Sequence, residues 1–263
     1  MKNFLAFLSL LAPASGALTV DFESPGGLAT YFAVGGDSTG ISEVVDGVGF
    51  NGSAGVSNQS ATRVHGFVVP ISFSGTTSTW QTSILWNPRD SNSVQFTLGV
   101  VDSPDLFFSG GTIPASVQDT ADVNDVLGSL YTTFASSGIN FYSGQPGIVP
   151  VEEAITLQSL PQNTWYRVAM DVQFNGGASY TTTASISSVD GVGNATSELV
   201  AASATFDNAA LAAGQVYPFF SVQDTLGNLD NFYNSAVVPE PGAVSLLGLA
   251  GATLLVRRRR SNG

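Results

Sequence analysis

Residues 164–174, TWYRVAMDVQF, alternate between two kinds of side chain, and this pattern constrains the fold more than any other feature of the sequence. If the segment is extended, one face carries only apolar and aromatic side chains: Tyr166, Val168, Met170, Val172 and Phe174. The NGG sequence at 175–177 follows, and Asn and Gly tolerate the positive φ angles of a tight turn. The segment therefore predicts a strand with one buried face that turns back as a hairpin.

Other stretches have the same character and are bounded by Gly, Asn, Asp or Pro. They are GFVVPISF (66–73), WQTSILW (80–86), SVQFTLGVV (93–101) and SYTTTASISSV (179–189). Many short strands separated by turns are typical of an all-β fold. We expect a two-sheet antiparallel β-sandwich of the jelly-roll type.

One segment, 122–134, breaks this pattern. Its apolar residues recur at helical spacing: Val123, Val126, Leu127, Leu130 and Phe134. We expect a short helix here, inside an insertion of about 103–150 that lies over an edge or a face of the sandwich. An irregular loop is the alternative.

The N-terminus has the layout of a secretory signal peptide. Lys2 precedes the apolar run 4–11, and small residues follow. Cleavage after Ala17 or after Ala14 suits these small residues. We take residues 1–17 as the signal peptide, so the protein is expected to be exported.

The C-terminal segment 237–263 has three parts in order. It begins with Val238, Pro239, Glu240 and Pro241, continues with the uncharged run 243–256, and ends with Arg257, Arg258, Arg259 and Arg260. The run is shorter than the about 20 residues that a full membrane span needs. Under the positive-inside rule the arginines stay in the cytoplasm, so a hydrophobic C-terminal helix would hold the chain in the inner membrane.

This tail resembles the PEP-CTERM sorting signal of Gram-negative bacteria. The resemblance implies recognition by exosortase, a membrane-embedded protease, and transfer to the cell surface or extracellular matrix. It also implies an association with exopolysaccharide and biofilm. In that case Glu240 and its flanking prolines are recognition residues, because prolines keep the backbone around Glu240 extended.

The charge of the chain excludes one class of partner. The formal net charge is −12, and only Arg63, Arg89 and Arg167 are basic between the two terminal signals. Phosphate binding requires clustered Lys and Arg, so no nucleic-acid partner is expected. The chain has no cysteine, which excludes disulfides and thiolate zinc sites.

Calcium is a candidate cofactor, because its ligands are carboxylate and carbonyl oxygens. Asp21 and Glu23 are two residues apart near the N-terminus, so they would share one face of a first strand. Asp230 lies in the last predicted strand. These three residues are the candidate ligands of a structural Ca²⁺, and ordinary solvated carboxylates are the alternative interpretation.

Sugar binding would require exposed aromatic rings. Phe107, Phe108, Phe141 and Tyr142 are the candidates, because they fall in the expected insertion and loops often carry binding residues. We also considered Trp80, Trp86, Tyr131 and Tyr233, although most aromatic residues of a sandwich belong to its core. A role for all of these rings in the core or in anchoring loops is the alternative.

The body also resembles concanavalin A-like, laminin-G-type jelly rolls. The residues that carry this resemblance are VDFES (20–24), NTWYRVAMDVQF (163–174) and NLDNFYNSA (228–236). It implies that the terminal strands pair with one another, and that sugar binding is one common use of the fold.

No catalytic residue is predicted. Glycoside hydrolysis needs two carboxylates that face one sugar bond, and the adjacent Glu152 and Glu153 would point to opposite faces of a strand. We therefore divide the chain into a signal peptide (1–17), a sandwich domain (18–236) and a sorting tail (237–263). The expected function is non-enzymatic adhesion or carbohydrate binding. A surface glycoside hydrolase or lyase and a purely structural matrix component are the alternatives.

Overall fold

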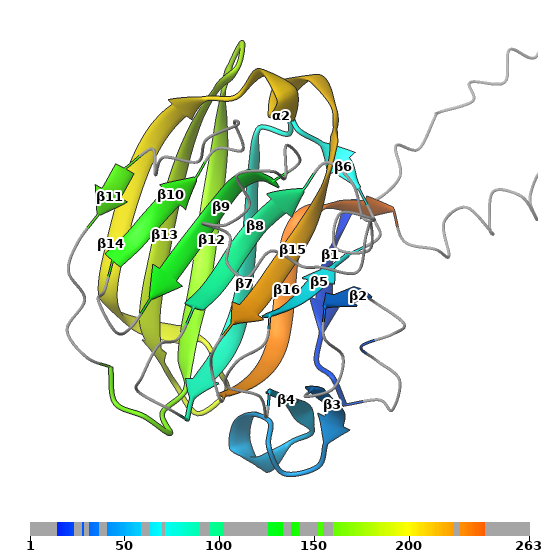
Figure 1. Cartoon of the computed structure of the whole chain (residues 1–263), viewed down its shortest axis with the longest axis vertical. Helices are drawn as coiled ribbons and strands as arrows, with labels where there is room; N and C mark the ends of the chain where they lie inside the picture. Colours follow the sequence, from blue (N-terminus) through cyan, green and yellow to red (C-terminus); the bar gives the residue numbers. More distant parts are fainter. Residues whose placement is uncertain are drawn as a thin grey trace, which may run out of the picture.

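In the part of the chain that the structure describes, two antiparallel sheets of eight strands each pack face to face (Figure 1). The computed structural model describes residues 15–23, 28, 32–36, 41–58, 64–69, 72–89, 95–101, 126–133, 138–142, 152–154, 160–223 and 227–239. The prediction of an all-β, two-sheet antiparallel sandwich is confirmed.

The first sheet, called sheet A, contains both terminal strands. Its order is β14-β13-β12-β7-β16-β4-β3, and β1 pairs with β16. The strands are β1 (Ser15–Val20), β3 (Ile41–Val45), β4 (Gly55–Asn58), β7 (Thr79–Pro88), β12 (Tyr166–Gly176), β13 (Ser179–Val189), β14 (Ala195–Asp207) and β16 (Gly227–Pro239).

The second sheet, called sheet B, lies opposite. Its order is β11-β10-β9-β8-β15-β5-β2, and β6 pairs with β15. The strands are β2 (Ala33–Gly36), β5 (Val64–Val68), β6 (Phe73–Ser74), β8 (Gln95–Val101), β9 (Val126–Thr133), β10 (Gly138–Tyr142), β11 (Glu152–Ala154) and β15 (Gln215–Gln223).

The alternating segment 164–174 forms β12, as predicted. Tyr166, Val168, Met170 and Val172 are buried on the face that turns toward sheet B. The NGG turn joins β12 to β13, and both of its glycines, Gly176 and Gly177, have positive φ angles of 102° and 63°. The hairpin follows from local residue chemistry, because few residue types other than glycine adopt such angles at no cost.

The two terminal strands pair along most of β1. Val20 lies opposite Phe232 and Thr19 opposite Tyr233, and the pairing extends to Ser15 opposite Pro239. The pairing of the terminal strands, implied by the jelly-roll resemblance, is confirmed. The predicted signal peptide and the predicted sorting tail are therefore connected to two strands, β1 and β16, that lie side by side in sheet A.

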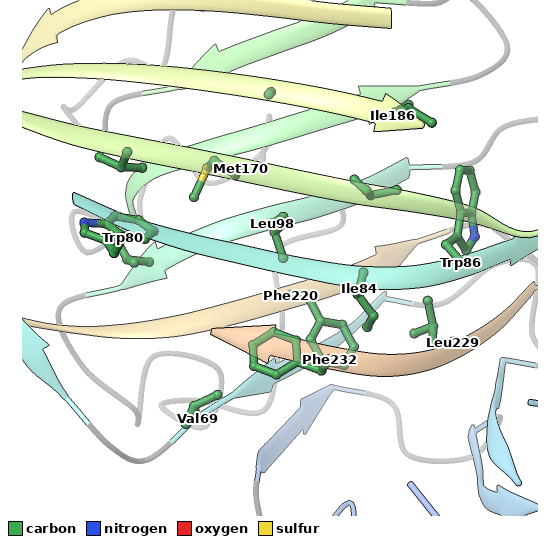
Figure 2. Close-up of a cluster of buried hydrophobic side chains, with 14 of the residues drawn as sticks. Val69, Trp80, Ile84, Trp86, Leu98, Met170, Ile186, Phe220, Leu229 and Phe232 are labelled. Carbon is green, nitrogen blue, oxygen red and sulfur yellow. The ribbon is translucent and has the colours of Figure 1, made fainter. Parts of the chain in front are cut away.

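The core fills the space between the sheets (Figure 2). Trp80, Ile84 and Trp86 from β7 and Phe232 from β16 are fully buried, and Leu98 and Phe220 meet them from sheet B. Trp80 and Trp86 are therefore core residues and do not form an exposed sugar platform. Burial of aromatic and aliphatic side chains of this size is the main force that holds the two sheets together.

The helix predicted at 122–134 is wrong over the part that the structure describes. Val126–Thr133 is strand β9, which pairs with both β8 and β10. Short apolar runs satisfy helical and strand spacing alike, and here the partners on both sides decide the outcome. Strands β9 and β10 belong to sheet B itself, so this part of the expected insertion is built into the sandwich rather than laid over it.

The helical segments whose bounds the structure describes are short: η1 (Phe50–Gly52) and α2 (Ala209–Ala213). Asn208 caps α2 by accepting a hydrogen bond from the Leu211 N–H at 2.9 Å. Nearby, the buried Tyr180 hydroxyl donates to the Gly75 carbonyl at 2.7 Å, and burial raises the pKa of Tyr180 to about 12.

Among the described residues, none of the helices has the length and apolar character of a membrane span.

Candidate functional site

A pocket of about 360 Å³ opens on the face of sheet A that turns away from sheet B. The described residues that line it are mostly polar and come from five segments of the chain. They are Thr19, Gln81, Ser83, Arg167, Val192, Asn194, Ala195, Asn231 and Tyr233. Its volume falls in the range of small-molecule binding sites.

The floor of the pocket follows from the alternation of side chains along the strands of sheet A. Gln81 and Ser83 follow Trp80 and Thr82 in β7, and those two side chains are buried in the core. Arg167 likewise lies between two buried neighbours in β12. Because successive side chains of a strand point to opposite faces, a buried core row requires a second row on the outer face. This second row is the pocket floor.

Arg167 holds the turn that forms one wall. Its Nε and Nη2 atoms donate to the carbonyl oxygen of Gly193 at 2.9 and 2.7 Å. Its Nη1 donates to the hydroxyl of Ser83 at 3.1 Å. Burial lowers the pKa of Arg167, and the negative charges of Asp190 and Asp230 oppose this shift. The Arg167 guanidinium therefore forms part of the pocket floor and also holds the turn that contains Gly193 in place.

The turn between β13 and β14 forms the rim. The Asp190 carboxylate accepts hydrogen bonds from the backbone N–H groups of Val192 and Asn194, both at 2.9 Å, and these bonds lower the pKa of Asp190. The Val192 side chain is 74% exposed at the tip of the turn. An exposed apolar side chain beside polar groups provides a contact for an apolar ligand surface.

A second loop, 46–53, is held by Asp230. Its Oδ2 accepts from the Phe50 N–H at 2.8 Å and from the Ser53 hydroxyl at 3.0 Å. Asp230 is 1% exposed, and burial raises the pKa of this carboxyl despite the hydrogen bonds. Asn51 Nδ2 of the same loop donates to the Gly191 carbonyl at 2.6 Å, so the loop and the β13–β14 turn support each other.

An irregularity in β16 positions the remaining wall. The register between β16 and β7 shifts between Asp230 and Tyr233. Asn231, within this shift, has a φ of 47°, a left-handed conformation that asparagine tolerates better than most residues. Bulges of this kind change the direction of side chains next to functional sites. Here Asn231 and Tyr233 both line the pocket.

The three calcium-ligand candidates are not gathered around one empty position. Strand β1 ends at Val20, and Asp21 and Glu23 follow it with exposed side chains, separated by Phe22 at a φ of 55°. Both oxygens of Asp230 accept hydrogen bonds, since Oδ1 accepts from the Asn231 N–H at 2.7 Å. The described residues contain no cluster of three or more His, Cys, Asp or Glu that would hold a metal ion. Calcium binding stays a prediction.

The other predicted site residues are only partly described. Phe141 and Tyr142 end β10, but their side chains, like the whole of Phe107 and Phe108, lie outside the described residues. Val238 and Pro239 are the last residues of β16. Glu240, Pro241 and the four arginines lie outside the described residues, as do the signal-peptide residues before Ser15.

Sequence reasoning considered Tyr233 among the aromatic candidates but did not select the other pocket residues. One signal was present, because Arg167 is one of three basic residues of the body and lies on the polar face of a well-predicted strand. The turn residues Val192 and Asn194 and the bulge residue Asn231 gave no such signal. Their position depends on pairing between distant strands.

The fold is similar to that of solved structures with low sequence identity. A lectin from Bauhinia forficata in complex with GalNAc has a TM-score of 0.53 at 15% identity, over 86% of this chain and 100% of that chain. Endo-β-1,4-glucuronan lyase from the fungus Trichoderma reesei has a TM-score of 0.51 at 10% identity, over 85% of this chain and 98% of that chain. No family model matches the sequence, and a search of curated proteins finds no match. The chain therefore has a lectin-like β-sandwich, a fold that occurs in both binding proteins and lyases.

Proposed function

We propose that this protein is an exported, non-enzymatic carbohydrate-binding protein that uses the pocket on the outer face of sheet A. One observation carries the proposal: hydroxyl, amide and guanidinium groups from four strands and a turn converge on one hollow, beside the exposed Val192. Sugars present hydroxyl groups for hydrogen bonding and C–H faces for apolar contact. A pocket with few, well-placed polar groups is suited to such a ligand.

Binding without cleavage is favoured by the residues of the pocket. None of the described lining residues carries a carboxyl group, and glycoside hydrolysis commonly uses two carboxylates that flank the sugar bond. Two carboxylates beside the pocket are occupied, since Asp190 holds the turn and Asp171 accepts from Gln81. The pocket therefore supplies recognition groups rather than a catalytic pair.

The binding proposal is tested on a glycan array with the full chain, the Tyr233→Phe variant and the Asn231→Gly variant. Tyr233→Phe removes only a hydroxyl, and glycine keeps the positive φ of Asn231 while removing its amide. Each variant is expected to weaken glycan binding with little change in melting temperature. Unchanged binding by both variants would contradict a role for this pocket, and the release of new sugar ends during incubation would make the protein an enzyme.

We further propose that the two termini direct export and sorting, as their resemblance to a signal peptide and a PEP-CTERM tail implies. The partners are an exosortase-type membrane protease, the inner membrane before processing and an exopolysaccharide outside the cell. Cell fractionation of a Gram-negative host that has such a protease tests this proposal. Replacing Glu240 by alanine, or the four arginines by serine, is expected to keep the protein from reaching the surface.

A further inference from the structure

Two amide side chains of the pocket have their orientation fixed by neighbouring carboxylates. Gln81 Nε2 donates to Asp171 Oδ1 at 2.7 Å, and Asn194 Nδ2 donates to Asp190 Oδ2 at 3.2 Å. An ionised carboxylate only accepts, so each bond directs the amide nitrogen toward the acid. Within the described part of the chain, no donor reaches the two amide oxygens, Gln81 Oε1 and Asn194 Oδ1. Each remains an acceptor for a ligand that donates hydrogen bonds.

The pocket also offers hydrogen-bond donors, among them the Thr19 hydroxyl, the Asn231 amide and the Arg167 guanidinium. Three of the five N–H groups of Arg167 bond to Gly193 and Ser83, which leaves one on Nη1 and one on Nη2 without a partner among the described residues. The Tyr233 hydroxyl can donate or accept. A ligand that combines donors and acceptors in one group, as a sugar hydroxyl does, matches this set better than a ligand with acceptors alone.

The charge around the pocket disfavours an anionic ligand. Arg167 is the only charged side chain among the described lining residues, and the charges of Asp190 and Asp230 act on it. Asp171 lies beside Gln81 on the neighbouring strand β12, and the whole chain has a formal net charge of −12. A carboxylated or sulfated sugar would therefore approach a surface of its own sign, which slows association and weakens binding. A cationic amino sugar would in turn meet the guanidinium at the pocket floor.

We infer that the pocket binds uncharged, hydroxyl-bearing sugar units and selects a neutral polysaccharide against acidic and amino polysaccharides. The sugar hydroxyls donate to Gln81 Oε1 and Asn194 Oδ1 and accept from the remaining N–H groups of Arg167. Val192 contacts an apolar edge of the ring. This assignment rests on the carbohydrate-binding function proposed above and names the ligand class for the same pocket.

The test compares binding of the full chain to three immobilised polymers: a neutral glucan or mannan, an acidic alginate and a cationic chitosan. Each is measured at low and at high salt. The neutral polymer is expected to bind at least about tenfold more tightly than alginate at low salt, with little dependence on salt. If alginate or chitosan bound as tightly as the neutral polymer or more tightly, the proposed ligand class would be wrong, but the proposed carbohydrate binding would stand. A lack of binding to all three would overturn the proposed function and this assignment with it.

A matched pair of variants ties the selectivity to the pocket. Gln81→Met removes the amide acceptor on β7 while keeping a side chain of similar length. Gln173→Met makes the same change on β12, at an exposed position that does not line the pocket. Gln81→Met is expected to weaken binding of the neutral polymer about tenfold, and Gln173→Met to leave it unchanged. Equal effects of the two variants would place the binding site elsewhere.

Discussion

Arg167 and Gly193 are 26 positions apart in the chain and are joined by two hydrogen bonds from one guanidinium to one carbonyl oxygen. Arg167 belongs to a central strand of sheet A, and Gly193 to the turn that forms the pocket rim. This contact holds the turn beside the outer face of sheet A, and the turn forms one wall of the pocket. It also explains why a basic residue stands near the start of a half-buried strand of an acidic protein.

Replacement of Arg167 by lysine is expected to lower the free energy of unfolding by about 1 kcal/mol, because an ammonium group does not reproduce the fork of donors that reaches Gly193 and Ser83. Replacement by alanine is expected to cost about 2 kcal/mol, since it also leaves Asp230 without a nearby positive charge. Chemical denaturation measures both values. Equal stability of the lysine variant and the unchanged protein would show that charge alone maintains the turn.

Gly193→Ala is expected to destabilise the protein by about 1 to 2 kcal/mol. Gly193 has a φ of 86°, and an added Cβ would lie 3.0 Å from Leu85 Cδ1. Gly191→Ala in the same turn is the matched control, because its φ is not in the left-handed region and nothing lies within 4 Å of the added Cβ. Thermal unfolding of the two variants should differ clearly, and similar melting temperatures would contradict this role of Gly193.

The stability of the protein is expected to depend on pH through Asp230. Burial raises the pKa of this carboxyl in the folded state above its unfolded value of about 3.9. The folded protein then retains a proton that the unfolded chain has released. The contribution to stability is therefore present below the unfolded pKa and is lost as the pH rises through the folded pKa. The stability difference between the unchanged protein and Asp230→Asn should fall as the pH increases from about 4.

Asp190 provides a control, because its contribution to stability is expected to change with pH in the opposite direction. Hydrogen bonds from its own turn lower the pKa of Asp190, so its contribution is present above the unfolded pKa and is lost as the pH falls through the folded pKa. The stability difference between the unchanged protein and Asp190→Asn should therefore shrink toward low pH. Urea unfolding over a pH series checks both trends, and parallel trends for the two variants would contradict the assignment.

The pairing of β1 favours cleavage after Ala14 over cleavage at the 1–17 boundary taken from the sequence, so the first residue of the exported protein is expected to be Ser15. Ser15 and Gly16 pair with Pro239 and Val238, so cleavage after Ala14 keeps β1 whole, whereas cleavage after Ala17 removes the first half of the strand. Mass spectrometry of protein from an expressing Gram-negative host decides between the two. A start at Leu18 would contradict the choice of site, and an intact start at Met1 would contradict the signal peptide.

Local chemistry explains why the fold class was predictable. The alternation in 164–174 and the glycines of the following turn act within a few residues, and the strand, its buried face and the hairpin all match the expectation. The wrong helix prediction at Val126–Thr133 also has its origin in local residue spacing. Val126 and Leu130 are four residues apart, a spacing that suits both a helix and a strand, and only pairing with β8 and β10 decides between the two.

The sequence by itself determined the sandwich class, the buried rows of its central strands and the acidic character of the chain. Only the tertiary structure decided where the pocket lies. Thr19, Ser83, Arg167, Asn194 and Tyr233 meet because β1 pairs with β16 and β7 lies between β16 and β12. Those pairings join segments that are far apart in the chain. Local periodicity determines which face of a strand is buried, but it carries no information about which strand will lie beside it.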